Sequence, residues 1–324
     1  IASGHNSMAF GFFANSTGWV STAFGHHTKA NGIFSTAWGN NTTASGESST
    51  AFGEGTISSD KYSTAFGRNT IASGFNSTAW GDENTASGPG STAFGSGNTA
   101  SGSNSTAFGG QTIASGTFST AFGQYTTASN YFSTAFGSQT TASNYFSTAF
   151  GSETTASGSR STAFGFRTTA SGDLSIAFGY NTKANTYAML AFGIYNDTTK
   201  NHGTDSYSNW YDDDPIFVIG NGDYSNRKNA LTVLKNGDTG IGTKSPTQKL
   251  DVNGNARFRY IGSGAYNAPV NQTSDGTLTI ATSDIRMKEN IQTLRNSLDK
   301  ILQLRGVSFT WKTEPEMGTR IGMI

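Results

Sequence analysis

Hydrophobic and polar residues follow one another in a short phrase that returns along most of the chain. An Ala-aromatic-Gly triplet recurs every 14 residues from residue 10 to residue 192, which makes fourteen copies without a slip. A second phrase, Thr-x-Ala-Ser-Gly, stands half a period away. Self-similarity at a fixed period identifies a repeat architecture, so this pattern governs the fold. The fourteen aromatic residues, which we call the aromatic column, are Phe10, Phe24, Trp38, Phe52, Phe66, Trp80, Phe94, Phe108, Phe122, Phe136, Phe150, Phe164, Phe178 and Phe192.

Each seven-residue half of the repeat fits a strand of about five residues and a tight turn, and is too short for a helix and a turn. We therefore expect an all-β solenoid with two strands in each 14-residue coil, stacked in register on its neighbours. The glycine of the second phrase is replaced only by Asn or Asp, which also tolerate a left-handed backbone, so we expect a positive φ there. This column contains Gly4, Gly18, Gly32, Gly46, Asp60, Gly74, Gly88, Gly102, Gly116, Asn130, Asn144, Gly158 and Gly172.

The side-chain directions follow from the residue marked x in the second phrase. This position holds Lys29 and Lys183, and a lysine cannot lie unpaired inside a narrow coil. The x position therefore faces out, and Thr, Ala and Gly of the same phrase face in. The same phase in Ser-Thr-Ala-aromatic-Gly places the aromatic column outside. Such a stripe exceeds the apolar surface that a monomer usually exposes, so we expect a homo-oligomer with this column at its axis. In the alternative, the aromatic rings fill the coil and the monomer is self-sufficient.

The repeat "NSTAFGxxTxASGxxSTAFG" resembles the head repeats of trimeric autotransporter adhesins over residues 1–193. The resemblance implies a left-handed parallel β-roll that packs as a homotrimer. This chain carries aromatic residues where the family usually has an aliphatic one. The architecture follows from the resemblance, whereas the ligand does not, because such heads bind varied surfaces.

The composition is that of a stalk rather than an enzyme. Hydrophobic residues make up only 34% of the chain, 41 of 324 residues are Gly, and Cys is absent. Residues 1–193 hold six Lys or Arg and seven Asp or Glu, a neutral surface without the electrostatic footprint of a nucleic-acid or anionic-membrane partner. No run of 18 apolar residues predicts membrane insertion. The chain begins within a repeat, without a signal peptide, so we expect a fragment or processed form of an extracellular protein.

The pattern changes after residue 193. Residues 194–214 are polar and irregular, and we expect a connector there. Its run Asp212, Asp213 and Asp214 offers oxygen ligands for Ca²⁺, or forms a solvated acidic loop. Residues 215–282 hold short alternating strands with Asn-Gly turns, which predict a β-rich stem. The stretch "GIGTKSPTQKLDVNG" resembles segments that precede a chaperone module in tail fibres and large bacterial surface proteins.

Residues 283–324 differ in kind from the repeats. Ser283 or Asp284 can cap a short helix. Four apolar residues in this helix step by three, four and three, which suits a seam between copies or an ordinary amphipathic helix on a small core. The seam residues are Ile291, Leu294, Leu298 and Ile301.

The stretches "SDIRMKENI" and "LRGVSFTWK" resemble the start of the intramolecular chaperone of endosialidase-type tail spikes. This family trimerises, guides a β-fibre to fold, and then cuts itself off. The resemblance implies cleavage between Ser283 and Asp284, with Ser283 as nucleophile and Lys288 as its activating base. A serine hydroxyl needs a neighbouring base, and a desolvated lysine can serve. Only 41 residues follow Ser283, so we expect an incomplete module.

These patterns favour a trimeric extracellular fibre for attachment, either a phage tail fibre or a bacterial surface adhesin. Its partners would be its own copies and an unidentified surface receptor, with glycans as one candidate class; we expect no cofactor and no metal. The turn residues His26, His27, Tyr125, Phe166 and Tyr180 could touch the receptor, or be turn filler.

Two other functions are considered. An ice- or crystal-surface-binding solenoid would use a regular threonine column: Thr112, Thr126, Thr140, Thr154 and Thr168. A polysaccharide-cleaving spike needs paired carboxylates in a groove, and the seven acids of the repeats form no such column.

Overall fold

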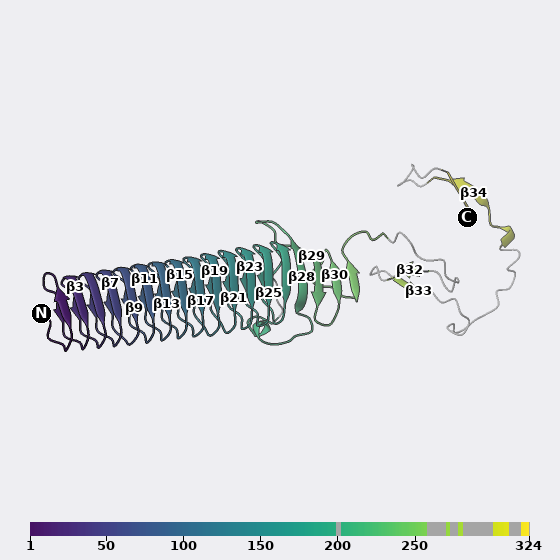
Figure 1. Cartoon of the computed structure of the whole chain (residues 1–324). Helices are drawn as coiled ribbons and strands as arrows, with labels where there is room; N and C mark the ends of the chain where they lie inside the picture. Colours follow the sequence, from purple (N-terminus) through teal and green to yellow (C-terminus); the bar gives the residue numbers. More distant parts are fainter. Residues whose placement is uncertain (199–201, 258–269, 273–277, 281–300, 311–318, 324) are drawn as a thin grey trace, which may run out of the picture. The chain divides into compact units, whose positions relative to one another are not determined.

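The computed structural model describes residues 1–198, 202–257, 270–272, 278–280, 301–310 and 319–323. The chain divides into two compact units, Ile1–Ala256 and Arg257–Ile324. In the first unit, successive strands stack in one direction to form a rod (Figure 1). This unit is the parallel β-solenoid that the 14-residue period predicted.

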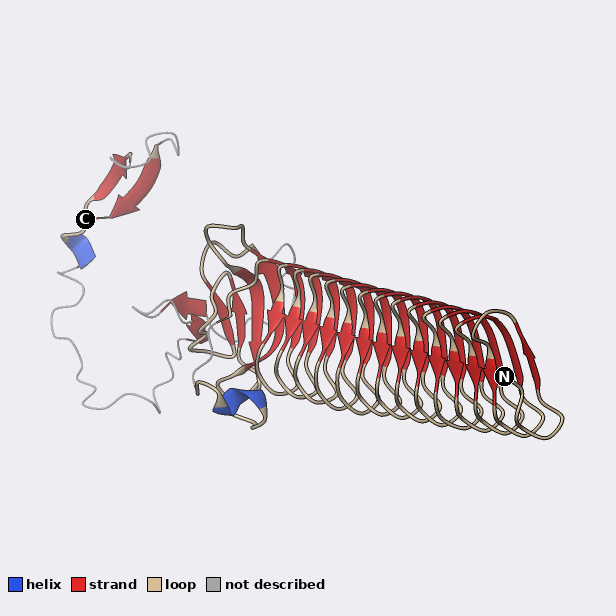
Figure 2. Ribbon diagram, turned by 90° about the vertical axis from the view of Figure 1, so that its left-hand side faces the viewer, coloured by secondary structure: helices blue, strands red, loops and turns tan. Residues whose placement is uncertain are grey.

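The longer sheet of the rod is built from the Ser-Thr-Ala-aromatic-Gly phrase (Figure 2). Each of its strands pairs in parallel with the strand 14 residues later, so that Phe10 lies beside Phe24 and Phe164 beside Phe178. The period therefore sets the register. The strands are β1 (Met8–Phe10), β3 (Thr22–His26), β5 (Thr36–Asn40), β7 (Thr50–Glu54), β9 (Thr64–Arg68), β11 (Thr78–Asp82), β13 (Thr92–Ser96), β15 (Thr106–Gly110), β17 (Thr120–Gln124), β19 (Thr134–Ser138), β21 (Thr148–Ser152), β23 (Thr162–Phe166), β25 (Ile176–Tyr180) and β27 (Leu190–Ile194).

The shorter sheet is built from the Thr-x-Ala-Ser-Gly phrase and also pairs in steps of 14, as Ala30 does with Ala44. Its 13 strands have two residues each, because the turns on either side take up most of the phrase. They are β2 (Asn15–Ser16), β4 (Lys29–Ala30), β6 (Thr43–Ala44), β8 (Ile57–Ser58), β10 (Ile71–Ala72), β12 (Thr85–Ala86), β14 (Thr99–Ala100), β16 (Ile113–Ala114), β18 (Thr127–Ala128), β20 (Thr141–Ala142), β22 (Thr155–Ala156), β24 (Thr169–Ala170) and β26 (Lys183–Ala184).

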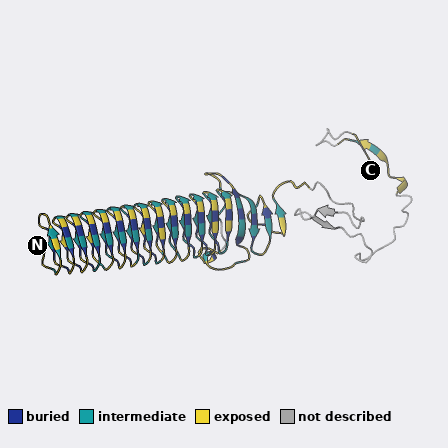
Figure 3. Ribbon diagram, in the orientation of Figure 1, coloured by how far each residue is buried: buried dark blue, intermediate teal, exposed yellow. Residues whose placement is uncertain are grey.

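Small side chains fill the interior of the coil. One alanine column from each sheet is buried, as Ala37 and Ala44 show, together with serine and threonine columns at the turns. The aromatic residues lie outside, and buried and exposed positions alternate along each long strand (Figure 3). The predicted phase is confirmed, and the alternative in which the rings fill the coil is wrong. The threonines of the ice-binding alternative are buried too, so that column presents no surface: Thr112, Thr126, Thr140, Thr154 and Thr168.

The glycine column of the second phrase does not have the predicted positive φ. Gly18 and Gly32 are absent from the residues with positive φ, and the left-handed residues stand two positions later, at Val20 and Phe34. The reason for glycine is space, since a β-carbon at Gly18 would clash with the carbonyl oxygen of Gly32 in the next coil. The prediction of positive φ in this column was therefore wrong, and the close approach of stacked backbones explains the column.

Asparagine and aspartate enter this column with a local change in hydrogen bonding. In most coils the glycine N–H donates to an alanine carbonyl of the next coil, as Gly102 does to Ala114 at 3.2 Å. The N–H of Asn130 instead donates to the Oγ of Ser133 at 3.1 Å. The Oδ1 atom of Asn130 accepts the N–H of Tyr131 at 2.8 Å. These side chains thus supply turn hydrogen bonds of their own, which is why Asn replaces Gly here.

The sheet continues past residue 193. β28 (Pro215–Asn221) pairs in parallel with β27, and Ile219 takes the place beside Phe192 after a step of 27 residues. The connector forms the 3₁₀ helix η1 (Asp205–Tyr207). Antiparallel β29 (Asn229–Leu234) and β30 (Thr239–Ile241) follow, and β31 (Leu250–Val252) pairs in parallel with β30. A hairpin therefore closes the end of the parallel sheet.

The described residues of the second unit form two antiparallel strand pairs. β32 (Val270–Gln272) pairs with β33 (Leu278–Ile280), and β34 (Gly306–Phe309) pairs with β35 (Arg320–Met323).

The close stacking of coils gives a test with two neighbouring glycines of β15. Gly109 has φ +126°, and a β-carbon there would clash with the Gly123 carbonyl oxygen, whereas a β-carbon at Gly110 meets only the Gln124 Cγ at 3.9 Å. We expect Gly109→Ala to lower the free energy of unfolding by about 3 kcal/mol. Gly110→Ala should change it by less than about 1 kcal/mol. Thermal and denaturant unfolding of the full chain measures both, and equal stability of the two variants would contradict the stacking argument.

Candidate assembly surface

The aromatic column lies in the middle of the long sheet. Each ring comes from the third residue of a five-residue strand, as Phe108 does in β15. Neighbouring ring centroids are 4.7–5.7 Å apart along the column. From Phe94 to Phe192 adjacent planes are within 5° of parallel. The rings therefore form one continuous stack on the outer face.

This stack is too exposed for a protein surface in water. Its members are between 36% and 69% exposed, with Phe66 the least and Phe10 the most. For side chains of this size the exposed apolar area adds up to about 1,000 Å². A monomer rarely exposes a contiguous apolar patch larger than a few hundred Å². The column thus has the character of an interface.

Charged residues flank the column without entering it. Arg68 and Asp82 form an ion pair at 2.5 Å, and Arg167 pairs with Glu153 at 2.7 Å, in each case between adjacent coils. These side chains are exposed, so each pair contributes at most about 1 kcal/mol. The hydrogen bond from Asp82 raises the pKa of Arg68, as Glu153 does for Arg167. The pairs join neighbouring coils and leave the aromatic face uncharged.

The predicted cleavage site lies outside the described residues, as do Ser283, Asp284, Lys288, Ile291, Leu294 and Leu298. Ile301 is described, in a helical turn at residues 301–302, and is 61% exposed. The roles of these residues remain predictions. Of the turn residues considered as receptor contacts, Phe166 is half-buried and the other four are exposed: His26, His27, Tyr125 and Tyr180.

The acidic run of the connector does not converge on one point. Asp212 accepts a hydrogen bond from the Trp210 Nε1 at 3.0 Å, and Asp213 pairs with the His202 Nε2 at 2.8 Å. Asp214 is buried beside Lys235, with 3.9 Å between its Oδ2 and the lysine Nζ. Among the described residues there is no group of three His, Cys, Asp or Glu that could hold a metal ion.

The buried pair of Asp214 and Lys235 was not predicted from the sequence. Asp214 precedes β28 and Lys235 follows β29, and the Lys235 N–H donates to the Asp214 carbonyl at 3.0 Å. Neither side chain is exposed to solvent. The lysine Nζ lies 5.1 Å from the ring centre of Trp210 and 5.8 Å from that of Tyr187, which joins connector, hairpin and last coils. Burial lowers the pKa of Lys235, and Asp214 opposes this shift.

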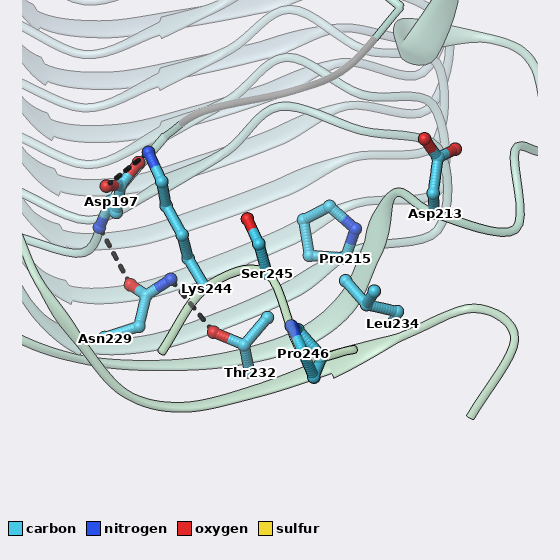
Figure 4. Close-up of a pocket in the computed structure, with 9 residues that line it drawn as sticks. All are labelled: Asp197, Asp213, Pro215, Asn229, Thr232, Leu234, Lys244, Ser245 and Pro246. Carbon is cyan, nitrogen blue, oxygen red and sulfur yellow. Dashed lines mark hydrogen bonds and ion pairs between the residues drawn. The ribbon is translucent and has the colours of Figure 1, made fainter. Parts of the chain in front are cut away.

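A shallow pocket lies beside this hairpin (Figure 4). Lys244 pairs with Asp197 at 3.3 Å across it. The Asn229 Oδ1 accepts the Asp197 N–H at 2.8 Å, and its Nδ2 donates to the Thr232 Oγ1 at 3.2 Å. The polar groups of the pocket therefore satisfy one another and hold the stem to the connector.

Two family models match the chain. The model described as chaperone of endosialidase matches residues 283–324. No curated protein matches the chain. No helix among the described residues is long and apolar enough to cross a membrane. Both matches confirm the resemblances seen in the sequence. The model described as YadA head domain repeat (2 copies) covers more than half of the chain and matches residues 2–18, 21–42, 44–70, 72–98, 100–126, 128–154, 142–168, 156–182 and 170–186.

The buried ion pair can be tested with two adjacent aspartates. Asp214→Asn leaves Lys235 buried without its counter-charge, so we expect the free energy of unfolding to fall by about 3 kcal/mol at neutral pH. The loss should shrink as the pH rises and Lys235 gives up its proton, because the penalty belongs to the charged amine. Asp213→Asn removes only an exposed pair with His202 and should cost less than about 1 kcal/mol. Denaturant unfolding at several pH values measures both, and equal losses would contradict the assignment.

Proposed function

The chain belongs to the family of YadA head domain repeats, and from this premise we propose that it is the shaft of a homotrimeric extracellular attachment fibre. The chain combines adhesin-type repeats with a C-terminal chaperone domain. The single observation that supports the trimer most directly is the exposed aromatic column. Three parallel copies around one axis would bury the columns against one another along the rod.

The chaperone domain fits the main difficulty of assembling such a fibre. Near-identical coils can pair one coil out of phase at little cost, because nothing in the repeated phrase distinguishes one register from the next. Pairing between chains is also non-local and slow. A domain that gathers three C-termini first would align the chains before the repeats associate. The proposed cleavage between Ser283 and Asp284, with Ser283 as nucleophile and Lys288 as base, would then release the finished fibre.

Attachment is the proposed role of the exposed surface. The repeats carry nearly balanced charges, which favours a neutral partner such as a glycan on a host or neighbouring cell over nucleic acid. The exposed turn residues, among them His26 and Tyr180, are the first candidates for contact. The fibre would be displayed outside the cell or on a virion.

The trimer axis can be tested by comparing two exposed apolar residues from one coil. Phe108 is 37% exposed in the aromatic column, and Ile113 is 43% exposed on β16 of the other sheet. In the proposed trimer Phe108→Asp places three carboxylates at the axis, so we expect loss of the trimer or a penalty of several kcal/mol. Ile113→Asp should keep the trimer and cost about 1 kcal/mol or less. Native mass spectrometry reports both; a monomeric parent chain would overturn the proposal.

Cleavage is tested in the protein expressed with a complete chaperone module. We expect chains that end at Ser283 by denaturing mass spectrometry, and uncut chains in Ser283→Ala. Lys288→Arg should also remain uncut, because arginine stays protonated and cannot act as the base. Cleavage of Ser283→Ala at the same bond would show that another residue is the nucleophile.

A further inference from the structure

The residues in which the coils differ lie mainly at the two turns of the solenoid. The interior repeats the same small residues, and the aromatic column holds Phe in all coils but two. We call the turn before each long strand the leading rim; it contains residues 5 and 6 and those at steps of 14 up to 187 and 188. The trailing rim follows each long strand and contains residues 12 and 13 and those at steps of 14 up to 194 and 195. Any information that distinguishes one coil from another on the axial side resides largely in these rims.

The rims carry exposed aromatic side chains in addition to the aromatic column. Phe13 is 65% exposed on the trailing rim, and Phe34 is 54% exposed on the leading rim. On the leading rim Phe118, Phe132 and Phe146 stack with ring centres 4.9 and 5.2 Å apart, and all three are exposed. Such clusters also exceed what isolated surface residues explain.

The geometry of three sheets around one axis brings the rims together. This step rests on the trimer proposed above. Packed sheets lie about 10 Å apart, so each sheet sits about 5 Å from a shared axis, and a triangle of three such sheets has sides of about 17 Å. A five-residue strand spans about 13 Å between its end Cα atoms. One turn residue at each end fills the remainder, so the trailing rim of one chain meets the leading rim of the next at each corner.

The two rims change character together along the rod. Near the N-terminus both are aromatic, with Phe13 on the trailing rim and Trp19 on the leading rim. Further along, both are charged, with Arg68 on the trailing rim and Lys61 on the leading rim. They then become small, and the next part has Gly110 on the trailing rim and Ser103, Pro89 and Gly90 on the leading rim.

We propose that the trailing rim of each chain packs against the leading rim of its neighbour at the same height, and that these matched rims specify the register of the trimer. The occupant of each rim is a second copy of this chain. A slip of several coils would place aromatic turns against charged or glycine turns and lose the match, whereas the aromatic column alone would tolerate it.

The chain contains no cysteine, so two introduced thiols can report the contact directly. Gly110→Cys lies on the trailing rim, where a β-carbon has open space, and Ser103→Cys lies on the leading rim half a coil earlier. Within one chain the strand Thr106–Gly110 separates them by more than the 7 Å that a disulfide spans. The matched control pairs Gly110→Cys with Ser159→Cys, another leading-rim serine four coils further on.

Both double variants of the full chain are oxidised and analysed by native mass spectrometry and by non-reducing denaturing gels. We expect trimers in both, a covalently linked trimer for the 103/110 pair, and at least tenfold less linkage for the 110/159 pair. A native trimer without linkage at 103/110, or with equal linkage in both pairs, would overturn the matched rims and leave the proposed trimer intact. Absence of any trimer would overturn the proposed function and the rims with it.

Discussion

The close stacking of narrow coils is the constraint on which the rest of this structure depends. A backbone carbonyl of one coil lies where a β-carbon of the previous coil would stand, at Gly18 as at Gly109. The interior between the two sheets accepts only alanine, serine, threonine and a few asparagines. Large apolar side chains must therefore lie outside the coil, and burying a phenylalanine contributes about 1.5–3 kcal/mol that the monomer does not collect in full. A coil this narrow favours association because its apolar surface points away from its own interior.

The repeat also explains which features could be predicted from the sequence. The period gave strand positions, register and the direction of the aromatic column, because a 14-residue step with invariant alanines leaves one consistent phase. The glycine column shows where this reasoning fails. Positive φ and lack of space both select glycine and admit asparagine, so a column of Gly with occasional Asn130 or Asn144 cannot separate the two causes. The positive φ belongs to bulky residues such as Val20 and Phe34, which propensity would place elsewhere.

The end of the solenoid was harder to foresee for a different reason. β28 continues the sheet in register with β27, yet it keeps only Gly220 from the repeated phrase and replaces alanine and phenylalanine by Val218 and Ile219. The pair of Asp214 and Lys235 depends on how β28 and β29 fold back on each other, and no local spacing encodes that contact. Predictions from the sequence were good where contacts repeat and poor where a contact occurs once.

Repetition and variation therefore serve separate purposes along this chain. The invariant residues determine how one coil stacks on the next, and this stacking would be the same in any register. In the proposed trimer, the variable turns decide which coils of neighbouring chains face one another. A chaperone at the C-terminus can bring three chains together, but it fixes their alignment at one end only, and fourteen coils separate that end from the first strand. Local differences such as aromatic, charged and glycine turns would carry the alignment along the remaining length of the fibre.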